Sequence, residues 1–127
     1  MPVQFLSDEW VDELRERLNQ SEAFRSSIAG KTATIQNVIA TSDGTKRYWF
    51  RIADGSVDLQ SGDAPTPDAT IEQDEATAAG LARGEINPVG AFMSGKLKIN
   101  GSMMLLMQLQ GALSELAKVM QEIDVDY

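Results

Sequence analysis

The chain has 127 residues, a length that suits one domain, and its formal net charge is -8. This acidic balance argues against nucleic acid as a partner, because affinity for DNA and RNA comes largely from basic side chains. There is no cysteine and no histidine, which excludes disulfides, Cys/His zinc sites and imidazole-based catalysis. Residues 1–9 lack the pattern of a secretion signal, and no apolar stretch is long enough to span a bilayer. We therefore expect a cytoplasmic protein.

Residues 1–29 are predicted to form a helical segment. Ser7 is placed to cap a helix in which apolar residues recur every fourth position, at Trp10, Leu14 and Leu18. A second short helix is expected from Ser21, with Gly30 after its end.

Residues 30–72 are predicted to form strands, because the apolar period changes from helical to alternating. Two Asp-Gly turn signals, at residues 43–44 and 54–55, divide this region into an antiparallel three-strand meander. The run 60–68 is rich in turn formers and is expected to be a loop, after which 69–72 can form a fourth strand.

Residues 73–127 are predicted to be helical, with one strand at 96–99. Asp74 is expected to cap the first helix, and Asn87 with Pro88 to begin a short second one. The strand at 96–99 is expected to close in an Asn-Gly turn at 100–101. One or two helices then follow from Ser102, with a candidate break near Gly111.

The run 102–107 is a helix candidate that is apolar on every side. Such a helix is either buried all round or lines a space that something else fills. Methionine is unbranched and adaptable, so it suits an irregular core as well as a pocket for ligands of varied shape. Both interpretations stay open on the residues alone.

The order of these elements and the run from Asn87 to Gly101 resemble the signature of the sterol carrier protein type 2 family. The resemblance is strongest over 67–110 and weaker over 30–59. On this basis residues 1–127 look like a single lipid-carrier domain of the stand-alone prokaryotic type.

The resemblance implies an α+β fold with an apolar tunnel between two layers. One layer is a twisted, mainly antiparallel sheet of about five strands, and the other consists of helices packed on one face. The implied function is the non-catalytic binding and carriage or presentation of a hydrophobic ligand: a fatty acid, an acyl-CoA, a sterol-like molecule or another lipid. The implied tunnel residues are Phe92, Met93, Leu97, Ile99, Met103, Met104, Leu106, Met107 and Leu109, and the facing stripe of the meander adds Phe50 and Ile52, which serve equally well as plain sheet core.

Other functions are weighed against carriage. No nucleophile with a base is evident, and the acidic residues do not match a calcium loop, so we expect no catalytic residues, no metal and no cofactor. The alternative is a protein-interaction or accessory module of a lipid-metabolising enzyme, with a collapsed pocket. We leave open a homodimer through residues 113–123. We also leave open transient docking on a membrane or an enzyme through Trp49 and the basic residues of the predicted strands. The simpler role of these basic residues is to form a solvated sheet face, and they are Lys46, Arg47, Arg51, Lys96 and Lys98.

Overall fold

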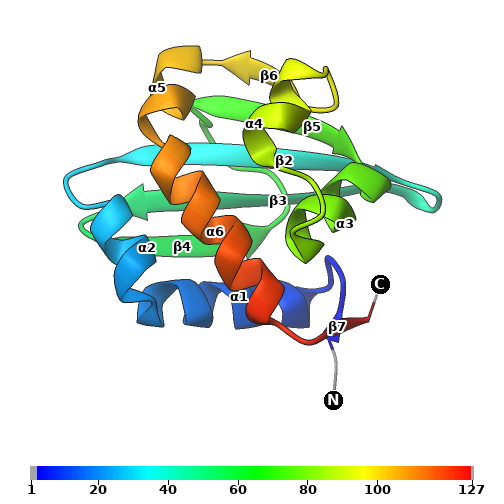
Figure 1. Cartoon of the computed structure of the whole chain (residues 1–127), viewed down its shortest axis with the longest axis horizontal. Helices are drawn as coiled ribbons and strands as arrows, with labels where there is room; N and C mark the ends of the chain where they lie inside the picture. Colours follow the sequence, from blue (N-terminus) through cyan, green and yellow to red (C-terminus); the bar gives the residue numbers. More distant parts are fainter. Residues whose placement is uncertain (1–2, 127) are drawn as a thin grey trace.

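The structure is a computed structural model that describes residues 3–126, with the backbone alone described at positions 88, 89, 106 and 126 (Figure 1). Its main sheet has five strands in the order β4-β3-β2-β5-β6. The strands are β2 (Ala33–Thr41), β3 (Gly44–Ala53), β4 (Ser56–Ser61), β5 (Ala69–Asp74) and β6 (Lys98–Gly101). The neighbours β2 and β5 are parallel and the other three pairs are antiparallel. The predicted five-stranded, mainly antiparallel sheet is confirmed, with the detail that it is mixed.

The parallel pair arises from the loop between β4 and β5. This loop carries the chain from the edge of the meander back to β2, so that β5 lies beside β2 and not beside β4. At its end, the Asp68 backbone N–H donates to the Thr34 carbonyl at 2.8 Å, and the Thr34 N–H donates to Asp68 Oδ2 at 2.8 Å. These two bonds fix the first residues of β5 against β2.

Six helices lie on one face of the sheet (Figure 1) within the described residues. They are α1 (Asp8–Gln20), α2 (Glu22–Ser27), α3 (Glu75–Arg83), α4 (Pro88–Met93), α5 (Met103–Gln108) and α6 (Gln110–Glu122). The predicted caps form as expected. The backbone N–H of Trp10 donates to Ser7 Oγ at 3.2 Å, and that of Thr77 donates to Asp74 Oδ1 at 2.7 Å. No helix in this part of the chain is both long and apolar enough to cross a membrane.

The core lies between the inner face of the sheet and the helices. Alternate residues of the central strands point inward and are buried, as the period-two pattern predicts. The apolar stripe of α1 packs against them, and α6 crosses the sheet from the β6 side towards α1 (Figure 1). The largest fully buried side chains are Trp10, Phe24, Leu14, Leu18, Ile28, Ile35, Ile39, Ile52, Leu59 and Leu109.

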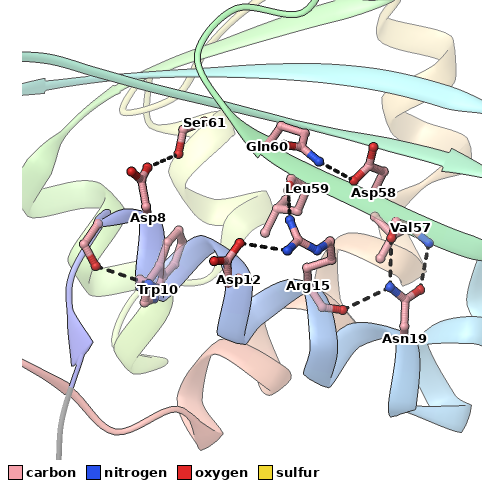
Figure 2. A network of polar contacts seen from close by, with 11 residues as sticks. Asp8, Trp10, Asp12, Arg15, Asn19, Val57, Asp58, Leu59, Gln60 and Ser61 are labelled. Carbon is pink, nitrogen blue, oxygen red and sulfur yellow. Dashed lines mark hydrogen bonds and ion pairs between the residues drawn. The ribbon is translucent and has the colours of Figure 1, made fainter.

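Polar side chains of α1 cover the edge strand β4 (Figure 2). The Asn19 amide exchanges two hydrogen bonds with the Val57 backbone, with both N···O distances at 2.9 Å. Arg15 Nη1 donates to the Leu59 carbonyl at 2.6 Å. An uncovered edge strand presents unpaired backbone groups that template aggregation, and these contacts cover part of that edge.

Two local features differ from the sequence-based expectations. The strand predicted at 96–99 is β6 at Lys98–Gly101, because the backbone N–H groups of Lys96 and Leu97 instead bond to the Ala91 carbonyl at 2.9 and 3.3 Å. The sequence predicts no strand near residues 3–4 or 125–126. In the structure β1 (Val3–Gln4) pairs in parallel with β7 (Val125–Asp126). A two-residue strand is too short to show an alternating pattern, so no signal for this pair is present in the sequence.

The outer face of the sheet is mostly polar. Arg47 and Arg51 are exposed on β3, and Trp49 between them is half-buried. Arg47 forms an ion pair with Asp63 at 3.0 Å, and Lys98 on β6 is exposed. For Arg47, Arg51 and Lys98 this arrangement agrees with the solvated-face interpretation. Lys96 precedes β6 and is on no strand, and Lys46 lies opposite the inward-facing Ile39. Docking through the basic residues stays a prediction.

Candidate functional site

An apolar groove with a cavity volume of about 300 Å³ opens between the inner face of β5 and β6 and the helices α4, α5 and α6. In Figure 1, β5, β6, α4 and α5 lie together at one end of the molecule, and α6 leads away from α5. The groove is lined by Ile71, Phe92, Met93, Leu97, Ile99, Met103, Met107, Gln110, Leu113 and Ser114.

Helix α4 and the turn after it form one wall of the groove. Asn87 caps this helix, and its Oδ1 accepts from the Gly90 N–H at 3.3 Å. The chain then folds back on the Ala91 carbonyl, which accepts from both Lys96 and Leu97. This reversal buries Leu97 beneath the helix and leaves Phe92 on the groove wall, 40% exposed.

Helix α5 forms the opposite wall. Ser102 begins it, with its Oγ accepting from the Leu105 N–H at 3.2 Å. Met103 and Met107 are four residues apart, so they share the face that lines the groove. Met104 lies off that face and is 71% exposed, while Met107 is 73% exposed. The all-apolar helix is therefore not buried all round, and its methionines line an open space on one side.

The chemistry of the groove is apolar and uncharged. Among the described residues, Gln110 and Ser114 are the polar members of its lining, and none of the lining side chains is ionisable. No group of three or more His, Cys, Asp or Glu side chains in that part of the chain is placed to hold a metal ion. Such a lining favours an apolar chain or ring and gives little basis for choosing a charged head group.

The structure brings together only part of the predicted ligand-binding set. Phe92, Met93, Leu97, Ile99, Met103 and Met107 lie around the groove. Met104 points elsewhere, and the side chain of Leu106 lies outside the described residues. Leu109, Phe50 and Ile52 are fully or almost fully buried in the core and do not line the groove. That any of these residues contacts a ligand stays a prediction.

Four groove residues are not among the predicted ones. Gln110, Leu113 and Ser114 come from the first turns of α6, and Ile71 comes from the inner face of β5. From the sequence, Leu113 belongs to a helix over 113–123 that either caps the tunnel mouth or forms a dimer face, and it is not among the predicted tunnel residues. The inward-facing position of Ile71 on its strand is the signal that could have identified it.

Comparisons with known proteins show which sequences and structures this chain is similar to. The sequence profile of the SCP-2 sterol transfer family matches residues 8–114. Mouse and human stomatin-like protein 1 are each 33% identical to the chain, over 81 and 82 residues respectively. These matches cover 63% of this chain and 20% of each relative, so the chain spans about a fifth of the length of the curated relatives it matches.

Solved structures share the fold. A crystal structure of sterol carrier protein 2 aligns with a TM-score of 0.83 at 23% identity, covering 94% of this chain and 99% of that one. A Thermus thermophilus protein described as possibly a sterol carrier protein aligns with a TM-score of 0.81 at 22% identity, covering 98% and 92%. Palmitated SCP2L2 from Aedes aegypti aligns at 0.62 and 16% identity, covering 89% and 92%.

Lipid binding is the general property of the family to which these comparisons point. The profile match covers most of the chain and includes all ten groove-lining residues named above. The chain belongs to the SCP-2 sterol transfer family.

Proposed function

We propose that this chain binds a single hydrophobic ligand, such as a fatty acid, in the groove between the sheet and α4, α5 and α6, and carries or presents it without catalysis. The observation that carries this proposal is the open, uncharged groove whose wall includes Met93 and Met107, 80% and 73% exposed. Large contiguous apolar surfaces are uncommon on proteins that have nothing to bind there. The palmitated state of the Aedes aegypti neighbour supports an acyl chain as the first ligand to test.

The free energy of such binding depends on how well the groove is formed in advance. Each buried methylene contributes about 0.8 kcal/mol, so a long acyl chain gains roughly 10 kcal/mol before costs. Association and ordering cost about 4 to 15 kcal/mol. The apolar wall therefore supports binding of moderate strength and weak selectivity for chain length.

The test compares two methionines of the same helix. Met107 lines the groove and Met104 does not, although their exposed fractions are nearly equal. We expect Met107→Asp to weaken the binding of a fluorescent fatty acid at least tenfold, because a carboxylate on the wall must lose water when the chain enters. Met104→Asp should bind like the wild type, and Met107→Leu should retain binding. Equal losses in both aspartate variants would place the ligand elsewhere.

The natural ligand is sought by native purification, organic extraction and mass spectrometry. We expect a stoichiometric lipid in the wild-type extract and its loss in Met107→Asp. A wild-type protein that carries no lipid and also fails to bind fatty-acid and sterol analogues would contradict carriage.

A second candidate function is that of an accessory module of an enzyme. One finding favours it: the chain covers only a small part of the length of several relatives. The chain matches 20% of the stomatin-like proteins, and it covers 16% of a sec-alkylsulfatase from Pseudomonas sp. that shares the fold with a TM-score of 0.60. Similar domains therefore occur inside longer proteins. An accessory module that docks on an enzyme would use the same exposed groove wall, and it would bind an apolar segment of the partner in place of free lipid.

A further inference from the structure

A second, smaller cavity of about 30 Å³ lies between the segment before α1, the first turn of α1, the inner face of the sheet, α3 and α6. Its lining includes Trp10, Tyr48, Gln73 and Met120. This volume is enough for one water molecule or for one small polar group of a ligand, and too small for an acyl chain.

Two polar atoms of the cavity wall lack a partner. Trp10 is 0% exposed, and its indole Nε1 has no hydrogen-bond partner among the residues the structure describes. The side-chain Oε1 of Gln73 also has no partner among these residues. Buried polar groups are nearly always paired, because an unpaired one loses its bonds to water without replacement. The indole N–H is a donor and the amide oxygen is an acceptor. A hydroxyl group has the chemistry to pair with both kinds of atom, since it accepts from an N–H and donates to a carbonyl oxygen.

The rest of the cavity is uncharged. Tyr48 packs edge-on against Trp10, with ring centroids 5.5 Å apart. Burial raises the pKa of Tyr48 above its usual range, so the phenol stays neutral. An ionised head group would find no opposite charge in this lining, and burying it there would be strongly unfavourable. The charged end of a lipid is therefore expected at the open groove, and its other end nearer this cavity.

The cavity continues the line of the groove along two elements. On β5, Ile71 lines the groove and Gln73 lines the cavity, two residues and about 7 Å further along the same face. On α6, Leu113 and Met120 do the same, two helical turns and about 10 Å apart. Between the two spaces lies Asn37, which is 4% exposed and opposite Ile71 and Tyr48 in the sheet register. Its Nδ2 also lacks a partner among the described residues.

We propose that this protein prefers ligands whose buried end carries an uncharged hydroxyl group, which Trp10 Nε1 and Gln73 Oε1 bind in the small cavity. The inference rests on the proposed function and specifies its ligand class. An ω-hydroxylated acyl chain and a sterol entering hydroxyl first present the same chemistry. A site built to pair a hydroxyl discriminates against the analogue that lacks it, because the analogue leaves the site's polar groups unpaired.

The experiment measures affinities for two matched pairs, palmitic acid with ω-hydroxypalmitic acid and cholestane with cholesterol. In the wild type we expect the hydroxylated member of at least one pair to bind about tenfold tighter, and the pair that responds identifies the ligand source. Gln73→Leu should abolish that preference while leaving the affinity for the parent compound. Gln108→Leu is the matched control, because Gln108 is exposed and lines neither the groove nor the cavity, and it should keep the preference.

A second readout does not depend on a core substitution. The chain has two tryptophans, so Trp49→Phe on the outer face leaves Trp10 as the sole emitter. The hydroxylated ligand should shift its emission, and the parent compound should not. Equal affinities within both pairs, or a preference that survives in Gln73→Leu, would overturn the inference and assign the cavity to a water molecule. Absence of binding by all four compounds would instead overturn the carrier function itself.

Discussion

Replacing Asn19 by alanine tests how the first helix is held on the edge of the sheet (Figure 2). The substitution removes the hydrogen bonds from Val57 N–H and to the Val57 carbonyl, both at 2.9 Å, and the local bond to the Arg15 carbonyl at 3.1 Å. Each intramolecular hydrogen bond contributes about 0.5 to 1.5 kcal/mol net, so the two bonds to β4 contribute about 1 to 3 kcal/mol. Alanine recovers up to about 0.7 kcal/mol through its higher helix propensity. We expect a net loss of about 1 to 2 kcal/mol in the free energy of unfolding.

The assay is urea unfolding followed by circular dichroism, with Gln20→Ala as the control. Gln20 is the next residue of α1 and is exposed, so its replacement should stay within about 0.5 kcal/mol of the wild type. Affinity for a fatty acid should be unchanged in Asn19→Ala, because α1 does not line the groove. A stability of Asn19→Ala equal to that of the control would refute the view that these bonds hold α1 on β4.

Three further predictions concern single residues. Mild peroxide should oxidise the exposed Met107 well before the buried Met120. Fatty-acid binding should then fall, because the sulfoxide is polar, and oxidation without loss of binding would argue against the groove as the binding site. Gly101→Ala should destabilise by more than about 1 kcal/mol in thermal unfolding, since φ is +111° and a Cβ would lie 2.5 Å from the Asp68 carbonyl oxygen; an unchanged melting temperature would contradict this close approach. Hydrogen bonding from the Thr77 side chain, and next from the Thr77 backbone amide, lowers the pKa of Asp74. The ionised cap therefore stabilises above about pH 4, and this contribution disappears as pH falls through the lowered folded-state pKa. The stability difference from Asp74→Ala, about 0.5 to 2 kcal/mol near neutral pH, should therefore shrink in acid, and a difference independent of pH would exclude this role.

The parts of the fold that the sequence predicts well are those fixed by neighbouring residues. Ser7 and Asp74 cap their helices because the bonded amide is three residues away, and the alternation within β3 follows from strand geometry. The position of β5 is different. Its pairing with β2 depends on the path of a loop and on contacts between residues 34 positions apart, such as Thr34 and Asp68. No local pattern encodes such a contact.

The same distinction applies to the candidate site. Leu97 and Met103 lie within residues 67–110, where the resemblance to the family is strongest, and the structure places both at the groove. The rotation of α5 is not readable from the sequence, because residues 103–107 are all apolar. In the structure α5 ends at Gln108, Leu109 is buried in the core, and Met104 is exposed to solvent. An apolar pattern without a polar face therefore predicts a surface that contacts something, and leaves open which residues make the contact.

The elements that form the groove differ in kind from those that form the core. The core is held by a helix of 13 residues and strands of 9 and 10 residues. The groove wall consists mainly of helices of 6 residues and a strand of 4. Helices this short are marginal alone, so their placement depends on what packs against them. Under the proposed function, a ligand that covered Phe92 and Met107 would supply such packing, and its binding free energy would add to the stability of the folded chain. The proposed function therefore predicts a wall that adjusts to ligands of different shape, while the sheet and α1 keep the fold unchanged.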